Sequence, residues 1–311
     1  MTGRITDARA FGRVAVLAGG WSPEREISLQ SGANVYNALL RRGVDAEMLD
    51  IDRADLLGDR LAGFDRVLNL MHGRGGEDGT VQALLDLRGL VYPGSGLAAS
   101  ALAMDKLRSK RVWRDAGLPT PAFAAPATLD EAMEAGAAIG YPLFVKPVAD
   151  GSSVGISKVH AAAELEVAFA EAARYGDVLM EAFAAGRELT CTVLGGEALP
   201  LICIEPDGAF YDYHAKYLSD ATRYLCPAPV DADLTRRVQT MALQAFAAIG
   251  ARHWGRVDFM LDAEGAPQLL EINTLPGMTT HSLVPMAAAA VGIDFDALCW
   301  RLLELTMEES P

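Results

Sequence analysis

The first hundred residues alternate between short apolar runs and longer stretches that read as helices. The run RVAVLA at 13–18 has the length of a buried strand and is ended by Gly19-Gly20. A helical stretch follows and stops at Gly43. Strands that alternate with helices indicate a parallel α/β sheet. The predicted elements of this unit are strands at 13–18, 46–50, 66–70 and 89–92 and helices at 26–42 and 80–87.

Beyond about residue 103 the pattern of elements changes, and a stiff Gly/Pro segment at 117–121 follows the next helix. We therefore expect an N-terminal α/β unit at 1–103, a second unit at 104–187 and a third at 188–311. The expected fold class is α/β, with α+β character in parts. The later predicted elements are strands at 143–148, 156–159, 178–181, 188–194, 198–205, 256–261 and 268–272 and helices at 105–116, 161–175, 234–249, 284–291 and 295–307.

Charge, apolar stretches and cysteine spacing indicate which kinds of binding partner and cell compartment to expect. The formal net charge is −14 and basic residues are scattered, which argues against nucleic acid as the main partner. No apolar stretch has the length of a signal segment or a bilayer span. The four cysteines have neither CxxC nor zinc-site spacing, as is typical of reduced thiols. We expect a cytoplasmic protein without a nucleic-acid or membrane partner.

The stretch from Arg256 to Asn273 reads as two strands joined by a Gly/Pro turn. Since strand side chains alternate between faces, Arg256, Asp258 and Met260 share one face of the first strand. On the second strand the alternation places Leu269, Glu271 and Asn273 together. Two carboxylates and an amide that converge in this way suit Mg²⁺ bound with substrate phosphates. The alternative is the solvated polar face of an edge hairpin.

Three loops carry further candidate chemistry. Lys146 ends an apolar strand and is followed by the small-residue loop at 151–155, whose amides and neighbouring lysine suit a phosphate. The loop lacks the order of a P-loop, and an ordinary hairpin turn is the alternative. Glu24 and His72 each follow a strand of the first unit, at the sheet edge where open α/β sheets bind ligands. Their alternatives are a helix-capping acid and a structural histidine.

Two later segments also stand out. The polar, aromatic stretch at 211–220 is typical of a functional lid, with a plain surface loop as the alternative. The loop at 276–283 offers Gly277 and further backbone N–H groups to an anion, although an unremarkable loop before a helix has the same composition.

Together these segments resemble the D-alanine:D-alanine ligases of the ATP-grasp superfamily. The resemblance covers about 13–305 and rests on GGxSxEREIS, HGxxGEDG, MDK, VKPxxxGSSVG, YDYxAKY, GRVDFML and EINTxPGMTxHSLxP, in that order. It implies a three-domain ATP-grasp fold and ATP-dependent formation of D-alanyl-D-alanine for peptidoglycan synthesis. It also implies Mg²⁺, with Mn²⁺ as a possible substitute, and a homodimer.

The resemblance assigns nucleotide and metal roles by position. Lys106 and Lys146 would bind phosphates beneath Ser153 and its neighbouring amides, while Glu181 and Glu188 would hold the adenine amino group and the ribose. The remaining implied ATP-binding residues are Phe183, Ala184, Phe210 and Met260. The implied metal ligands are Asp258, Glu271 and Asn273. One departure from the family pattern is Ala182, where members often carry a longer or charged residue.

The resemblance also assigns substrate roles. Glu24, aided by His72, would anchor the ammonium group of the first D-alanine. Arg256 and the Gly277 amide would stabilise the tetrahedral intermediate. The second D-alanine would bind through its carboxylate to Lys216, Ser282 and the Leu283 amide. A hydrogen-bonded trio of Glu24, Ser152 and Tyr217 would close a lid at 211–227.

The chemistry agrees with these residue types. A carboxylate is a poor acyl donor, so ATP must first convert it to an acyl phosphate, and the enzyme needs cations rather than a nucleophile. Three alternatives remain. A D-lactate-using ligase is disfavoured by Tyr217, and a catalytically inactive nucleotide-binding regulator by the intact metal and arginine positions. Another ATP-grasp ligase, such as one that makes glutathione, is disfavoured by GGxSxEREIS and HSL.

Overall fold

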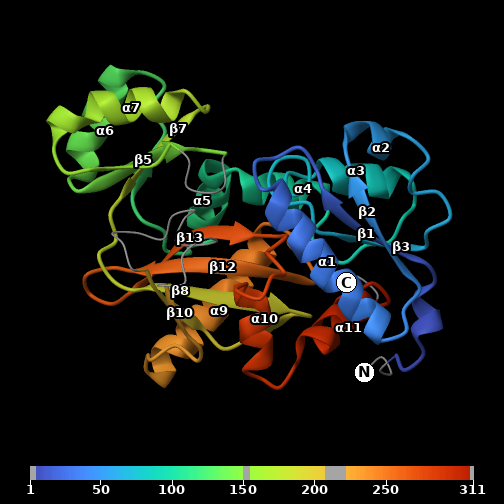
Figure 1. The fold of residues 1–311 in the computed structure, drawn as a ribbon. Helices are drawn as coiled ribbons and strands as arrows, with labels where there is room; N and C mark the ends of the chain where they lie inside the picture. Colours follow the sequence, from blue (N-terminus) through green and yellow to red (C-terminus); the bar gives the residue numbers. More distant parts are fainter. Residues whose placement is uncertain (1–4, 150–154, 207–221, 309–311) are drawn as a thin grey trace.

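Three β-sheets organise the chain in the computed structural model, which describes residues 5–149, 155–206 and 222–308 (Figure 1). The first sheet is parallel, with strand order β2-β1-β3, and thus confirms the α/β class. All six residues of β1 are buried, and α1 packs against it. The elements of this part are β1 Val14–Gly19, α1 Arg25–Arg41, β2 Ala46–Ile51, α2 Arg53–Leu57, β3 Arg66–Asn69, α3 Thr80–Leu87 and α4 Leu97–Met104, after a short 3-10 helix at Ala8–Phe11.

The strand predicted at 89–92 is wrong. Only Val91 pairs there, through an isolated parallel bridge to Arg66. The helices α2 and α4 were not predicted. The segment of α4 is rich in alanine and lacks a side-chain cap, so it has few of the signals that mark a helix start. Because α4 crosses residue 103, the proposed division between the first two units stays a prediction.

The second sheet is antiparallel, with order β4-β7-β5-β6, and forms the upper-left lobe of Figure 1 together with α6 and α7. Its elements are β4 Phe123–Ala124, α6 Leu129–Ile139, β5 Leu143–Pro147, β6 Ser157–Val159, α7 Leu165–Ala173 and β7 Val178–Ala182. Helix α6 was not predicted, although the residues at its start are typical of a helix N-terminus. The Thr128 side chain accepts the Glu131 N–H at 3.2 Å, and the Glu131 carboxylate accepts the Ala127 N–H at 2.7 Å.

The third sheet is also antiparallel, with order β11-β10-β8-β12-β13 and β9 beside β8. Its strands are β8 Glu188–Leu194, β9 Glu197–Ala198, β10 Ile202–Glu205, β11 Arg223–Leu225, β12 Trp254–Leu261 and β13 Pro267–Asn273. The helices of this part and of its connection to the first sheet are α5 Lys106–Asp115, α9 Ala232–Ala248, α10 Leu283–Ala289 and α11 Phe295–Leu305.

Two predictions about this sheet are wrong. The single strand expected at 198–205 is two strands, β9 and β10, separated at Pro200, which has no N–H for a ladder. Within the lid expected at 211–227, residues 223–225 form β11, which pairs with β10 and is therefore part of the sheet.

The first and third sheets share one hydrophobic core, although they are far apart in sequence. Phe11 packs edge-on against Trp300, with ring centroids 4.8 Å apart, and α1 lies against α11 (Figure 1). A second core joins Trp113 of α5 to the buried face of the third sheet. Side chains from both ends of the chain are therefore held in one packed body.

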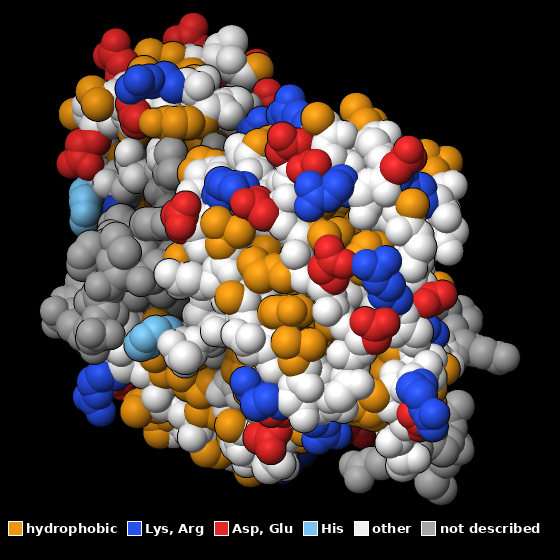
Figure 2. Space-filling model, turned by 45° about the vertical axis from the view of Figure 1, so that its right-hand side comes forward, with side chains coloured by type: hydrophobic (Ala, Val, Ile, Leu, Met, Phe, Trp, Pro, Cys, Tyr) orange, Lys and Arg blue, Asp and Glu red, His pale blue; other side chains and the backbone are white. Residues whose placement is uncertain are grey.

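In the described part of the chain, the face of the molecule in Figure 2 shows no large area of a single charge. On the face in Figure 2, Lys and Arg side chains lie among Asp and Glu side chains. Within the described ranges, no helix combines the length and the apolar character needed to cross a bilayer.

We predict that Gly76→Ala lowers the free energy of unfolding by about 1–3 kcal/mol. An added Cβ would lie 1.5 Å from the Met71 carbonyl oxygen, and the Gly76 carbonyl holds Asn69 and Gln82 side chains in place. Gly58→Ala is the control, since the nearest atom to its added Cβ is 3.4 Å away. Equal urea midpoints for the two variants would contradict this account.

Candidate active site

The central strand β12 gathers polar side chains from three strands on one face. Asp258 lies opposite Thr190 on β8 and Glu271 on β13. Arg256 lies opposite Thr192 and Asn273. Directly opposed residues share a face, so these six side chains form a common polar surface. The other face of the three strands is apolar and buried, through Val257, Phe259, Leu261, Leu189, Cys191 and Val193.

A β-bulge changes the face pattern expected for β13. Phe259 pairs with Leu269 although Asp258 pairs with Glu271, so Leu270 is an extra residue on β13. The extra residue reverses the alternation beyond it. Leu269 is consequently fully buried in the apolar core, and the prediction that it shares a face with Glu271 is wrong.

Asp258 is buried and fully engaged by its neighbours. The Arg256 guanidinium donates to both carboxylate oxygens, from Nε at 2.8 Å to Oδ1 and from Nη2 at 2.7 Å to Oδ2. The Thr190 hydroxyl donates to Oδ1 at 2.6 Å. Thr190 was missed by the sequence reasoning, although the alternation of Glu188, Thr190 and Thr192 along β8 would have placed it on this face.

Glu271 also has a cationic neighbour. Its Oε2 lies 3.2 Å from Nζ of Lys106, the first residue of α5. The Lys106 N–H donates to the Val148 carbonyl at 3.1 Å, so the start of α5 is attached to the chain that leaves β5. A residue predicted to bind phosphate and a residue predicted to bind metal are thereby in direct contact.

The donor set suits a hard divalent cation that also has phosphate ligands. Among the described residues, no group of three or more His, Cys, Asp or Glu side chains is arranged to hold a metal alone. Asp258, Glu271 and the Asn273 amide face one side, and Asn273 is oriented by a 3.0 Å bond from the Leu275 N–H to its Oδ1. Mg²⁺ commonly takes one or two carboxylates and completes its octahedron with water and phosphate oxygens.

A buried charge cluster lies beside this face. Glu181 of β7 forms ion pairs with Lys110 through Oε1 and with Lys146 through Oε2. Burial raises the pKa of Glu181, but the charges of Lys110 and Lys146 outweigh this effect and hold the pKa below its ordinary value. Both carboxylate oxygens are thus paired with lysines, and the role of Glu181 toward adenine stays a prediction.

Lys110 was not predicted, yet it links the second and third sheets. Its ammonium donates to Glu181, to the Thr120 hydroxyl at 2.7 Å and to the Leu269 carbonyl at 3.2 Å. Burial lowers the pKa of Lys110 to about 8, against the opposing effect of the Glu181 charge. The position was marked in the sequence by its spacing of four residues from Lys106, which places the two lysines one helical turn apart.

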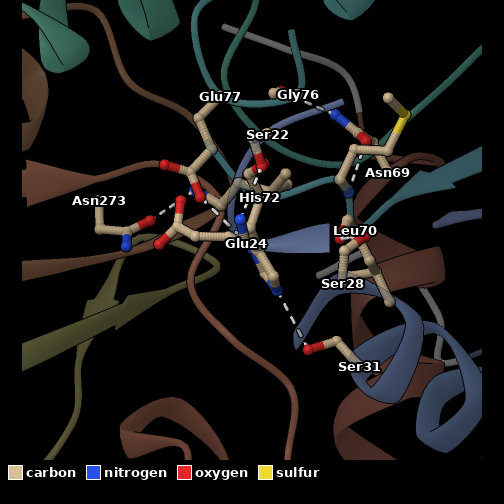
Figure 3. Close-up of polar contacts among 12 residues, drawn as sticks. Ser22, Glu24, Ser28, Ser31, Asn69, Leu70, His72, Gly76, Glu77 and Asn273 are labelled. Carbon is tan, nitrogen blue, oxygen red and sulfur yellow. Dashed lines mark hydrogen bonds and ion pairs between the residues drawn. The ribbon is translucent and has the colours of Figure 1, made fainter. Parts of the chain in front are cut away.

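The first sheet contributes Glu24, His72 and Glu77 (Figure 3). His72 is buried; its Nδ1 lies 3.4 Å from Glu77 Oε1, and its carbonyl accepts the Ser22 hydroxyl at 2.6 Å. Glu24 is the N-cap residue of α1 but makes no side-chain capping bond, so the capping alternative stays open. Figure 3 shows Glu24 and Glu77 pointing toward Asn273 of the third sheet. The structure therefore brings the two sheets' candidate residues together.

The loop before α10 is held by its own side chains. The Thr279 N–H donates to Ser282 Oγ at 2.8 Å. A Cβ on Gly277 would lie 2.8 Å from the same oxygen, so only glycine permits this close approach. Ser282 is the N-cap of α10, and Leu283 is its first residue.

Of the remaining predicted residues, four lie in the described part of the chain and five lie outside it. Glu188 and Met260 are paired across β8 and β12, two pairs along from Asp258 and Thr190 and therefore on the same face of the sheet. The Lys158 ammonium lies 3.5 Å from the centroid of the Phe183 ring, and Phe183 and Ala184 are the first two residues after β7. The predicted residues that lie outside the described part of the chain are Ser152, Ser153, Phe210, Lys216 and Tyr217.

Two antiparallel sheets with converging lysines and carboxylates, beside a parallel α/β unit, define an ATP-grasp enzyme. The family model described as the D-ala D-ala ligase C-terminus matches residues 112–304. The curated D-alanine–D-alanine ligase of Alkalilimnicola ehrlichii is 54% identical over 299 residues, which cover 95% of each chain.

Solved structures agree. The Bacillus anthracis D-alanine–D-alanine ligase complexed with ATP has a TM-score of 0.80 and 30% identity, with 95% of this chain and 97% of that chain covered. The VanG D-Ala:D-Ser ligase of Enterococcus faecalis has a TM-score of 0.84 and 30% identity, with 94% and 99% covered. The chain belongs to the D-alanine–D-alanine ligase family and is an ATP-dependent ligase.

We predict that Lys110→Met lowers the free energy of unfolding by about 3 kcal/mol, because Glu181 would stay buried with one cation fewer. The double variant K110M/E181M should recover part of this loss. The buried carboxylate is then removed together with Lys110, and the charge left without its partner is that of Lys146, whose side chain is 12% exposed. Lys158→Met is the control and should cost no more than about 1 kcal/mol, because only a cation–π contact is lost. Urea denaturation measures all three, and a K110M loss no larger than that of K158M would contradict the assignment.

Proposed function

We propose that this protein joins two D-alanine molecules into D-alanyl-D-alanine through a D-alanyl phosphate, at the meeting point of its three sheets. The observation that carries the proposal is the polar face of β8, β12 and β13, which holds Asp258, Glu271 and Asn273 beside Lys106 and opposite Glu24. That arrangement supports a single site in which the groups proposed for the metal ion, for a phosphate and for the substrate ammonium lie together.

Asp258, Glu271 and Asn273 would hold Mg²⁺, for which Mn²⁺ can substitute. When bound, the ion neutralises the charge of the phosphoryl group during transfer. Lys106 and Lys146 add fixed positive charge for the ATP phosphates, and the ion pairs that these lysines make with Glu271 and Glu181 keep the carboxylates compensated before ATP arrives. Glu188, Phe183, Ala184 and Met260 would contact the nucleoside, with Ser153 and Phe210 from outside the described residues.

The first D-alanine would bind with its ammonium group at Glu24 and beside His72. After its carboxylate is phosphorylated, the second amine attacks the carbonyl carbon. Arg256 and the Gly277 N–H would stabilise the oxyanion that forms, and the carbon–oxygen bond to phosphate then breaks. Lys216, Ser282 and the Leu283 N–H would hold the carboxylate of the second D-alanine.

Binding three reactants side by side supplies much of the catalysis in such a scheme. Well-oriented intramolecular reactions gain about 7–11 kcal/mol from positioning alone. An acyl phosphate also reacts with water, so the site must exclude solvent. We propose that residues around Tyr217, with Ser152 and Glu24, provide this cover, while β11 remains part of the sheet.

Cellular context follows from the proposed product. D-Alanyl-D-alanine is a peptidoglycan precursor, so we propose a cytoplasmic role in cell-wall synthesis. The resemblance further supports a homodimer, which sedimentation can test directly.

The direct test is ADP release by the purified chain with Mg²⁺ and ATP. We expect turnover with D-alanine alone, one dipeptide per ADP, and none with L-alanine. The VanG relative acts on D-serine, so mixtures of D-alanine with D-serine and with D-lactate belong in the assay. A mixed product that predominates over the D-alanine dipeptide would reassign the second substrate, and ATP binding without turnover would favour the regulator.

We predict that Glu271→Gln lowers kcat at least about a hundred-fold, because an uncharged amide weakens both the cation site and the pairing with Lys106. Glu264→Gln is the matched control, since Glu264 is an exposed acid in the turn between the same two strands. Near wild-type turnover by E271Q in the ADP-release assay would remove Glu271 from the catalytic centre.

A further inference from the structure

Helix α1 holds the backbone of a loop that lies more than 240 residues further along the chain. Ser31 and Asn34, one helical turn apart, both contact Met278. The Met278 N–H donates to Ser31 Oγ at 3.2 Å, and Asn34 Nδ2 donates to the Met278 carbonyl at 3.2 Å. The two peptide groups that follow Gly277 are therefore fixed from the N-terminal unit.

The same Ser31 hydroxyl reaches the His72 ring. Oγ lies 3.1 Å from Nε2, and both side chains are buried (Figure 3). Because Oγ accepts the Met278 N–H, its own proton is available to Nε2. Donation to Nε2 leaves the ring proton on Nδ1, which faces Glu77 Oε1 at 3.4 Å. The contacts thus form one chain from Glu77 through His72 and Ser31 to Met278.

We propose that Ser31 is a positioning residue that sets the tautomer and orientation of His72 and, with Asn34, aligns the Gly277 loop with the first D-alanine. The inference rests on the proposed function, in which His72 assists the first substrate and the Gly277 N–H stabilises the oxyanion. Both groups act on the same D-alanine, His72 beside its ammonium group and the Gly277 N–H at its carboxyl carbon. One hydroxyl that contacts both sides therefore links substrate binding to the chemical step.

A structural serine on the same helix offers a matched comparison. Ser28 is equally buried; its hydroxyl accepts the Gly19 N–H at 2.8 Å and donates to the Leu70 carbonyl at 2.7 Å. Ser28 and Ser31 each accept one backbone N–H, but only Ser31 donates to a side chain of the site. Ser28→Ala and Ser31→Ala should therefore cost similar stability and differ in function.

The first arm of the test is ¹⁵N NMR of the full chain with labelled histidine, without ATP. The His72 signals are assigned with His72→Gln, at about pH 8.5, two units above the ordinary histidine pKa. We expect a protonated Nδ1 and an unprotonated Nε2 in the wild type and in S28A, and mixed tautomers in S31A. An Nε2–H tautomer in the wild type, or an unchanged spectrum in S31A, would overturn the proposal.

The second arm is steady-state kinetics, with D-alanine varied at saturating ATP and, in a separate series, ATP varied at saturating D-alanine. We expect kcat/KM for D-alanine to fall about ten-fold in S31A, with KM for ATP unchanged, because one hydrogen bond of the site is lost. Asn34→Ala should lower kcat while leaving the His72 tautomer as in the wild type. Equal losses in S28A and S31A would reduce Ser31 to a structural role.

The two arms separate this inference from the proposed function. The NMR signature requires no turnover, so a wild type that makes no dipeptide would remove the proposed function and leave the tautomer result standing. Wild-type turnover together with an S31A spectrum like that of the wild type would remove only the role of Ser31.

Discussion

The register of β12 between β8 and β13 is the constraint on which the site depends. Because side chains alternate along a strand, this register places Arg256 and Asp258 on the same face as Glu271 and Asn273. A slip of β12 by one residue would turn Arg256 and Asp258 into the apolar core, away from Glu271 and Asn273, and would bring Val257 and Phe259 to the polar face. Burial of that apolar face, against Trp113 and its neighbours, is what opposes the slip.

Charge compensation is the second requirement. Removing one partner from a buried ion pair is costly because the remaining charge is left without solvent. Asp258 has Arg256, Glu271 has Lys106, and Glu181 has Lys110 and Lys146. The cations that compensate the carboxylates in the unliganded protein include the two lysines proposed for the ATP phosphates. In the proposed reaction, ATP binding would therefore replace the carboxylate partners of these two lysines by phosphate oxygens, without reorganisation of the surrounding side chains.

Sequence patterns predicted most of the frame because alternation and helical spacing are local signals. The strands β1, β8 and β12 and the helices α3 and α11 occur close to the predicted ranges. The bulge at Leu270 could not be read from alternation, since an inserted residue is recognised only by its partner strand. The break at Pro200 and the cap at Thr128 were local signals that could have been used.

For the site, motif positions give the groups that we propose to contact substrates, but not the residues that hold those groups in place. Thr190, Lys110 and Ser31 act through contacts with residues distant in sequence, and a single sequence carries no record of such contacts. Ser31 in particular resembles Ser28 in every local respect. Only the fold shows that one faces His72 and the other a strand carbonyl.

We propose that this site activates a carboxylate by phosphorylation. The test uses D-alanine with both carboxylate oxygens labelled with ¹⁸O, followed by mass analysis of the phosphate released with each dipeptide. We expect one ¹⁸O atom per phosphate, because the oxygen that attacks phosphorus leaves with it when the amine displaces phosphate. Unlabelled phosphate, or label found in AMP, would exclude an acyl phosphate intermediate.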